Sequence, residues 1–338
     1  MLINTVAGMW TLFILVSILI AASGFKLLTY AEALSNRLNL GHTWAGTILL
    51  ATVTSFPELF SGLSSVTIAH SADMAIGGVL GSCVFNLSIV VIIDYFYRGP
   101  SFYTKASRSH LLVGAIGIVL IGVVLFSTFL RTMNLGFNLA HIGLDSIVIV
   151  LIYLTAMKGL YNFEAAIEPS EKEDNFSGLN TTSLAIRYTI SSLIVIAAGW
   201  VLPIVGTHLV VLMGWSEAFV GTIFIAFATS LPELAVTFAA IRSLAVDLAL
   251  SNLLGSNLFN IMILAVDDVF YLKGPLLQEY KSGHMLTGAS SILMTGLVII
   301  SLISPPKKKV FNFVSAFSFI ILFIYIINSI VLYQAGKS

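Results

Sequence analysis

Two stretches of the sequence place a glutamate in the middle of an apolar segment, shortly after a threonine and a serine. The first reads GTILLATVTSFPELFSG and contains Glu58, and the second reads GTIFIAFATSLPELAVT and contains Glu233. Side chains three and four residues apart share one face of a helix, so each carboxylate has two hydroxyls beside it. A carboxylate within an apolar membrane segment is costly unless it is paired or faces water, and it therefore indicates a functional site. The four hydroxyls belong to Thr54, Ser55, Thr229 and Ser230.

Each of these stretches is followed by a second polar pair on the next apolar segment. GVLGSCVFN contains Ser82 and Asn86, and NLLGSNLFN contains Ser256 and Asn260, with the same spacing of four residues. If the four segments meet as helices, they offer two carboxylates, six hydroxyls and two amide carbonyls. Hard cations such as Ca²⁺ and Na⁺ take oxygen ligands of this kind, whereas zinc, copper and iron prefer His or Cys. The pattern predicts a site for a hard cation.

A proline directly precedes each glutamate. Pro57 and Pro232 lack an amide N–H and clash with the preceding turn, so each helix should kink or break there. The carbonyls of Val53 and Ala228 would then be free to face a cation. Two structural interpretations compete with a cation site: a buried salt bridge, for which no basic residue is expected near the glutamates, and hydroxyls that bond only to their own helix.

The composition places these motifs in a membrane. Of the 338 residues, 58% are hydrophobic and 9% are charged, whereas a soluble domain carries about 25% charged residues. Sixteen basic and sixteen acidic residues leave no net charge, which argues against nucleic-acid binding. The single cysteine, Cys83, excludes an internal disulfide and makes a soft-metal site improbable. We therefore expect an all-α polytopic membrane protein.

Ten apolar segments can be separated, since one bilayer-spanning helix needs roughly 20 residues. The only long polar connection between them, residues 162–183, is expected to be a cytoplasmic linker. It divides the chain into residues 1–161 and residues 184–338, with five segments each. The predicted segments are 8–28, 44–68, 73–95, 110–130, 139–160, 184–212, 217–241, 247–271, 285–304 and 311–333.

The distribution of Lys and Arg predicts the orientation. Twelve of the sixteen basic residues fall on the side of the linker, and four fall on the other side. Cytoplasmic loops retain positive charge, so the linker should lie inside and both termini outside, in the plasma (inner) membrane. The four residues on the outer side are Arg131, Lys273, Lys281 and Lys337.

The glutamate motifs recur 175 positions apart, in the second and third segments of each half. Because five is an odd number, the two halves should lie in the membrane with opposite orientations, as an inverted repeat. Such repeats allow transporters to open a midplane site alternately to either side. A duplicated structural scaffold is the alternative, but it would not need the repeated polar residues.

Charged residues near the segment ends are expected to have ordinary roles. Asp73 and Asp247 begin their segments, where a carboxylate can cap exposed N–H groups. Four further aspartates and all six histidines are expected to face solvent or the membrane interface. These are Asp94, Asp145, Asp267, Asp268, His42, His70, His110, His141, His208 and His284.

Two inverted copies of G-T-x-x-x-A-x-x-T-S-x-P-E, each followed by G-S-x-x-x-N, resemble the alpha repeats of the cation/Ca²⁺ exchanger superfamily. The resemblance is closest to the Na⁺/Ca²⁺ exchangers of prokaryotic type. It implies that the polar residues of both repeats line the cation sites, with Glu58 and Glu233 as the central Ca²⁺ ligands. It also implies that the carbonyls of Ala51 and Ala226 are ligands, and that the first and sixth segments slide to gate the site.

This sequence departs from many members of that superfamily at Asn86 and Asn260, because those members carry Asp in one repeat. Two formal negative charges would then remain in the site. The short linker also leaves no room for the regulatory Ca²⁺-binding domains of animal exchangers.

The expected function is antiport of Na⁺ and Ca²⁺, with both ions as substrates, no cofactor and no obligate protein partner. An H⁺/Ca²⁺ antiporter, or one for another divalent cation, is the main alternative, because a desolvated glutamate could carry a proton. A cation channel is a remote alternative. No His-Glu-x-x-His or paired catalytic motif appears in the segments, so an enzyme is not expected.

Overall fold

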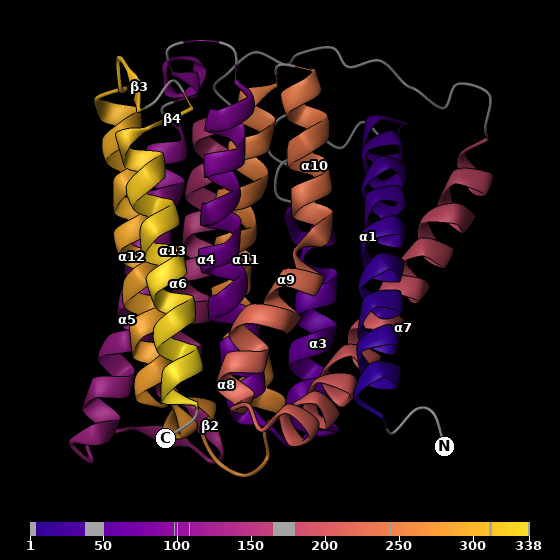
Figure 1. Ribbon diagram of the computed structural model, residues 1–338, viewed down its shortest axis with the longest axis vertical. Coiled ribbons are helices and arrows are strands. Elements are labelled where there is room, and N and C mark those ends of the chain that lie inside the picture. Colours follow the sequence, from indigo (N-terminus) through magenta and orange to yellow (C-terminus); the bar gives the residue numbers. More distant parts are fainter. Residues whose placement is uncertain are drawn as a thin grey trace.

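The computed structural model describes residues 5–37, 51–97, 99, 101–107, 109–164, 180–243, 245–310 and 313–336. Most of the expected linker, the start of the second expected segment and His42 lie outside these residues. The described chain forms a bundle of mostly upright helices, with α1 and a tilted α7 at one edge and α12 and α13 at the other (Figure 1).

Within the described ranges, the first half of the chain is mostly helical and contains one small hairpin. Its elements are α1 (Val6–Arg37), α3 (Phe56–Thr67), α4 (Ala72–Phe96), the 3-10 helix η2 (Phe102–Lys105), α5 (Ser109–Thr132), β1 (Asn138–Leu139), β2 (Ile142–Gly143) and α6 (Leu144–Glu164).

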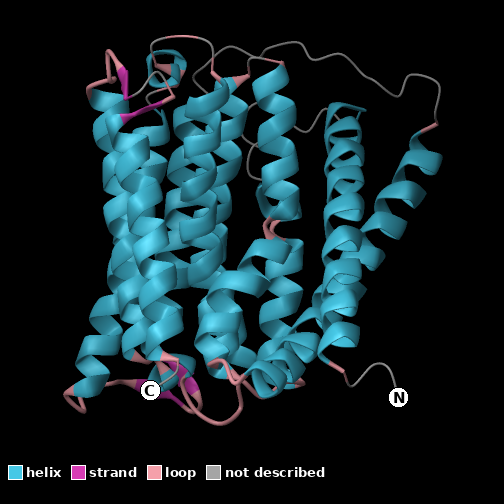
Figure 2. Cartoon of the chain, viewed as in Figure 1, coloured by secondary structure: helices cyan, strands magenta, loops and turns pink. Residues whose placement is uncertain are grey.

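The second half has the same kinds of element in a similar order. Figure 2 shows that the described chain is almost entirely helical, with short strands near both ends of the bundle. Its elements are α7 (Thr181–Met213), α8 (Glu217–Phe219), the π-helix η3 (Val220–Ile225), α9 (Ala226–Thr229), α10 (Leu231–Arg242), α11 (Val246–Phe270), the 3-10 helix η4 (Leu276–Glu279), α12 (Ser282–Ile303), β3 (Lys309–Val310), β4 (Val314–Ser315) and α13 (Ala316–Ala335).

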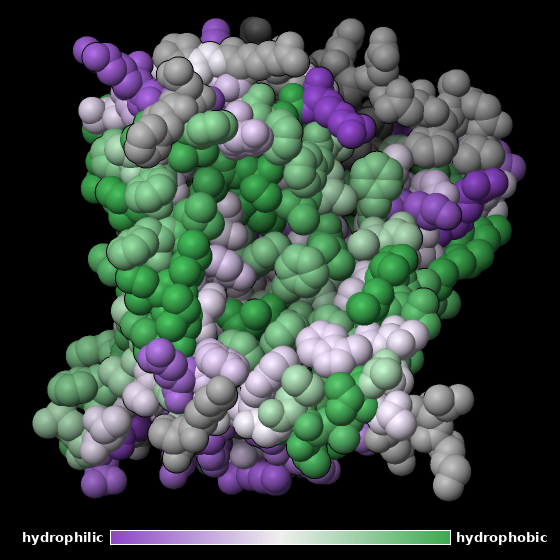
Figure 3. Space-filling model, viewed as in Figure 1, coloured by the Kyte–Doolittle hydropathy of each residue, from purple (hydrophilic) through white to green (hydrophobic). Residues whose placement is uncertain are grey.

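Among the described residues, seven helices are long and apolar enough to cross a membrane. An eighth span would be the pair Glu217–Thr229 and Leu231–Arg242, which is bent by 44°. Apolar side chains cover the middle of the molecule, and hydrophilic ones gather toward its two ends (Figure 3). The chain is therefore an integral membrane protein, and the predicted helical class is confirmed. The number of ten spans stays a prediction.

The helices α4 and α11 form the centre of the bundle. In the most apolar stretch of each of these two helices, 78% and 72% of the residues are buried, compared with 22% in α13 and 28% in α5. These two helices pack against each other, and α4 also packs closely on η3. A Cβ atom on Gly81 of α4 would collide with the backbone of Thr222 in η3, so only glycine permits this approach.

Two expected segment boundaries are wrong for the same reason. Residues 139–143 and 311–315 were expected to begin membrane helices, but short antiparallel hairpins precede α6 and α13 instead. Apolar hairpin residues cannot be distinguished from helical ones by hydropathy alone.

Candidate cation site

Both glutamate-bearing segments break where the proline predicts it. The backbone of Ser55 has φ −87° and ψ 12°, and that of Ser230 has φ −86° and ψ 11°. The helices α3 and α10 begin at the next residue, with the proline in their first turn. The two breaks thus have nearly the same geometry, and each sets its glutamate at the start of a new helix.

The two glutamates are buried and are linked through serines of both halves. Ser230 donates a hydrogen bond of 2.9 Å to Glu58, and Ser82 donates one of 3.4 Å to the same Oε1 atom. The Oε1 atom of Glu233 accepts from Ser256 at 3.1 Å and from Ser55 at 3.3 Å. Each carboxylate therefore binds one serine from its own half and one from the other half.

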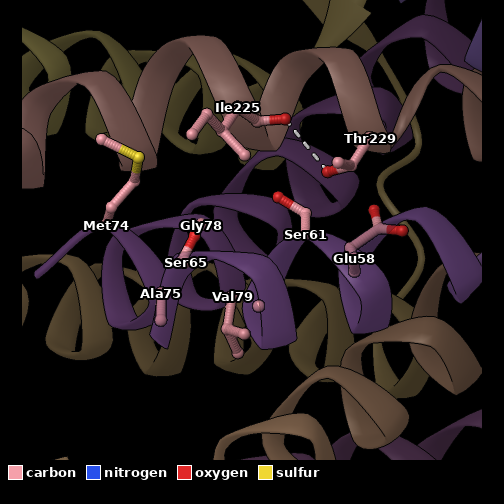
Figure 4. A pocket seen from close by; sticks show the side chains of 10 residues that line it. Glu58, Ser61, Ser65, Met74, Ala75, Gly78, Val79, Ile225 and Thr229 are labelled. Carbon is pink, nitrogen blue, oxygen red and sulfur yellow. Dashed lines mark hydrogen bonds between the residues drawn. The ribbon is translucent and has the colours of Figure 1, made fainter. Parts of the chain in front are cut away.

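The two motif threonines lie beside these serines. The Oγ1 atom of Thr54 is 3.3 Å from Ser256 Oγ, and that of Thr229 is 3.5 Å from Ser82 Oγ. Thr229 also donates to the carbonyl of Ile225 at 3.0 Å (Figure 4). The structure thus brings together all eight of the predicted hydroxyl and carboxylate side chains, since both threonines and all four serines surround the two glutamates.

The carbonyls of Ala51 and Ala226 lie one turn before the breaks. Each accepts the N–H of a motif serine, Ser55 at 3.2 Å and Ser230 at 3.0 Å, and each is also within hydrogen-bond distance of the adjacent threonine hydroxyl. A carbonyl oxygen has two lone pairs, and here both are directed to protein donors.

The two asparagines differ in their surroundings. Asn86 donates a hydrogen bond of 3.1 Å to Asn257, which in turn donates one of 3.1 Å to the carbonyl of Cys83. Neither polar atom of the Asn260 amide has a hydrogen-bond partner within the described part of the chain. Sequence reasoning missed Asn257 as a residue of the site. Its alignment with Cys83, directly after the repeated Gly-Ser pair, was a usable signal.

Several buried oxygens of the cluster remain available as ligands. Within the described ranges, the Oε2 atoms of Glu58 and Glu233 and the Oδ1 atoms of Asn86 and Asn260 accept no hydrogen bond. The four salt bridges seen among these residues also leave both glutamates without a basic partner. Buried acceptors of this kind are rare unless water or an ion satisfies them.

A small pocket opens beside Glu58. Its walls include Ser61, Ser65, Gly78 and Thr229, and its volume of about 10 Å³ holds about one water molecule (Figure 4). Within the described residues no three His, Cys, Asp or Glu side chains cluster as a metal site. Hydroxyl, amide and carboxylate oxygens are thus the donor set, which suits a hard cation.

Asp73 and Asp247 do not cap their helices as expected. Ser71 caps α4, while Asp73 forms an ion pair with Lys281 and a hydrogen bond of 3.0 Å with the Nε2 atom of His284. The hydrogen bond to Asp73 raises the pKa of Lys281.

The equivalent aspartate of the second half, Asp247, lies 2.9 Å from His110 and accepts the N–H of Ser107 at 2.6 Å. Each aspartate therefore ties its helix to the other half of the chain.

The same pairs correct the expectation for two histidines. His110 and His284 are buried, because each points at one of these aspartates from the start of α5 or α12. His70 and His208 are exposed as expected, and His141 is half-buried.

The four aspartates expected in solvent are buried instead. Asp94 accepts the N–H of Ser315, and Asp145 pairs with Arg131. Asp268 accepts from Gly143 N at 2.8 Å and from Ser146 Oγ at 2.6 Å. The hairpins and loops fold back onto these helix ends, and segment boundaries alone could not show that.

Asp267 is the exception among them. It is fully buried against Gly62 of α3, and neither carboxylate oxygen has a hydrogen-bond partner in the part of the chain that is described. The equivalent position of the first half is Ile93.

The sequence of this chain is similar to those of known membrane exchangers. Residues 8–160 and 182–332 match the family described as sodium/calcium exchanger protein. The uncharacterized membrane protein MJ0091 of Methanocaldococcus jannaschii is 24% identical over 283 residues, which is 81% of either chain.

Two solved structures show the same fold. The H⁺/Ca²⁺ exchanger CAX aligns with a TM-score of 0.64 and 15% identity over 97% of this chain and 88% of its own. The sodium–calcium exchanger NCX_Mj, soaked with Na⁺ and Sr²⁺, aligns with a TM-score of 0.60 and 19% identity over 96% of this chain and 98% of its own. The chain belongs to the sodium/calcium exchanger protein family and is a cation/Ca²⁺ antiporter of the membrane, not an enzyme.

Proposed function

We propose that this protein exchanges Na⁺ for Ca²⁺ at the paired glutamates. One observation carries the proposal: Glu58 and Glu233 are buried, lack a basic partner among the described residues, and are bridged by Ser230 and Ser55 across the two halves. Two carboxylates can balance the charge of one divalent ion, whose entry would displace these hydrogen bonds. Na⁺ would compete for the same oxygens.

The proposed ligand set consists of side-chain oxygens from both repeats and two backbone carbonyls. It comprises Glu58, Glu233, Thr54, Ser55, Thr229, Ser230, Ser82, Asn86, Ser256, Asn260, Ala51 and Ala226. Asn86 donates to Asn257 through Nδ2 and keeps its Oδ1 atom without a partner among the described residues. The two carbonyls already accept protein hydrogen bonds, so each would have to share a lone pair to bind an ion.

Alternating access would follow from two inverted five-helix repeats, residues 1–161 and residues 184–338, joined by a linker at 162–183. The packing supports this arrangement, because α1 packs on α10 just as α7 packs on α3, and α12 packs on α4 just as α11 packs on α5. Sliding of α1 and α7, which pack on each other, would open the site.

The charge distribution supports a plasma (inner) membrane protein with both termini outside and a cytoplasmic linker. The outer side would then be the lower end of the molecule in Figure 1, where α1 begins and α13 ends.

Coupling to Na⁺ is supported by the T-S-x-P-E motif in both repeats. Coupling to H⁺ is the second candidate, and the likeness to CAX together with two glutamates that lack basic partners among the described residues favours it. A proton on either glutamate could replace Na⁺ as the driving ion.

Transport into liposomes tests the proposal. Vesicles loaded with Na⁺ are diluted into Na⁺-free buffer with ⁴⁵Ca²⁺, beside vesicles loaded with choline and vesicles with a pH gradient. We expect Ca²⁺ uptake that requires the Na⁺ gradient. Uptake driven by the pH gradient alone would establish H⁺/Ca²⁺ exchange. A Ca²⁺ flux that depends on neither gradient and is unchanged by Glu58→Gln would indicate a channel.

A further inference from the structure

We infer that this protein binds one anionic phospholipid along α1, with the phosphate at Lys26 and Arg187 and an acyl chain between α1 and the bend of α9 and α10. The site is separate from the cation ligands. It is carried by two cavities that meet at Lys26.

The headgroup end is a cavity of about 250 Å³ between α1 and α7. Lys26 enters it from α1 and Arg187 from α7, and Tyr30 and Ser191 form part of the walls. Over the residues for which contacts are known, no carboxylate lies within ion-pair distance of Lys26 or Arg187. A guanidinium and an ammonium group in one cavity suit a phosphate, because both donate charge-assisted hydrogen bonds.

The acyl-chain end is a larger cavity of about 680 Å³, which shares Ala22 and Lys26 with the first. It runs along α1 past Phe25 and Ile18, and its far wall consists of Phe227 and Leu231. Ile14 marks its other end. From Lys26 to Ile14 the axis of α1 rises roughly 18 Å, which is comparable to the ~15 Å of one leaflet of the bilayer core.

The continuity of the two cavities selects the ligand. A neutral lipid would fill the apolar groove but leave both cations without a counter-charge. A free phosphate would satisfy the cations but leave the groove unused. An anionic lipid satisfies both ends. In the proposed orientation the cations face the cytoplasmic leaflet, whose anionic lipids attract basic clusters.

The bound chain would lie beside the contact between α1 and the cation site. Gly24 of α1 packs so closely on Pro232 that an added Cβ would lie 2.5 Å from its Cγ atom. Pro232 directly precedes Glu233. A lipid wedged between α1 and Leu231 would therefore lie beside the contact over which α1 would slide on α10.

Native mass spectrometry of the full-length protein in detergent tests the binding. The probes are phosphatidylglycerol, phosphatidylcholine and inorganic phosphate, each titrated separately. The test variant is Lys26→Gln/Arg187→Gln, and the matched control is Lys158→Gln/Arg242→Gln, which removes two exposed cations elsewhere. The charge-conserving Lys26→Arg/Arg187→Lys variant shows whether any loss follows charge or misfolding.

We expect wild-type protein to bind phosphatidylglycerol at least tenfold more tightly than phosphatidylcholine. The test variant should lose that preference, and the control and charge-conserving variants should keep it. Equal affinity for the two lipids, an equal loss in the control pair, or binding of inorganic phosphate without a preference between the lipids would overturn the inference. Because binding is measured without an ion gradient, this result is independent of whether Na⁺ drives transport.

Discussion

The two halves of the cation site use the same residue types but differ at one neighbouring position. Glu58 and Glu233 accept equivalent serine hydrogen bonds. Position 83 is a cysteine, however, while its equivalent in the second half is Asn257. The Asn257 side chain crosses to the first half and holds Asn86, whereas Asn260 keeps both polar atoms free of protein partners in the described chain.

Two copies of a sequence repeat can therefore differ in their hydrogen bonding. Both amides keep an unbonded Oδ1 atom among the described residues, but only the Asn86 amide is held in place by a hydrogen bond, which its Nδ2 atom donates to Asn257. The threonines show the same asymmetry, since Thr54 lies 3.3 Å from Asn252, whose equivalent in the first half is Gly78. The hydrogen bonds between serines and glutamates are therefore equivalent in the two halves, whereas those of the amide side chains are not.

Removing the shared part of the site should have the largest effect. Glu58→Gln and Glu233→Gln should each lower ⁴⁵Ca²⁺ uptake about 100-fold, a loss of about 2.7 kcal/mol in ion binding, because one carboxylate cannot balance a divalent ion. The exposed Glu279→Gln change is the matched control and should leave uptake unaltered. A large difference between the two glutamate variants would break the twofold description of the carboxylates.

Replacing each of the two site asparagines with alanine should have different effects in the two halves. Asn260→Ala should raise the Ca²⁺ concentration for half-maximal uptake about tenfold, a change of about 1.4 kcal/mol, because a free ligand is lost. Asn86→Ala removes a similar free oxygen and should also lower the free energy of unfolding by about 1–2 kcal/mol, because Asn257 loses a partner. Concentration series of uptake and thermal unfolding in detergent measure both effects. Equal effects of the two variants on stability would contradict the asymmetry.

Making the neighbouring position alike in both halves should have a smaller effect. Asn257→Cys removes both hydrogen bonds of that amide and should lower the free energy of unfolding by about 1–2 kcal/mol, with uptake changed only a few-fold. Cys83→Ala, at the same position of the other half, is the control and should be less destabilising in the same thermal assay. Loss of transport without loss of stability would mean that Asn257 itself binds the ion.

The smallest effect is expected at a further asymmetric position, Asp267, whose equivalent in the first half is Ile93. Since its carboxylate is buried without a partner among the described residues, Asp267→Asn should raise the free energy of unfolding by about 1 kcal/mol at neutral pH. Asp268→Asn should do the opposite, because Asp268 accepts three hydrogen bonds. Opposite shifts in thermal unfolding of the two variants would support this reading, and destabilisation by Asp267→Asn would assign that carboxylate an undetected partner.

Much of the site could be predicted because its spacing is local. Helical periodicity puts Thr54, Ser55 and Glu58 on one face whatever the rest of the chain does, and proline breaks a helix by its own covalent geometry. The repeat then transfers each inference to the second half. The partners of Asp73 and Asp94 could not be found in this way, and neither could Gly143 and Ser146 as partners of Asp268. They all lie more than a hundred positions away in the chain.

The membrane class, the two broken helices and the oxygen chemistry of the site follow from the sequence alone, because composition and short spacings act within a few residues. The packing of the helices is needed to show which serine binds which glutamate, that Asn257 binds Asn86, and that Lys26 and Arg187 share one cavity. Those contacts depend on how helices from opposite halves are packed, and hydropathy and spacing within one helix contain no information about that packing.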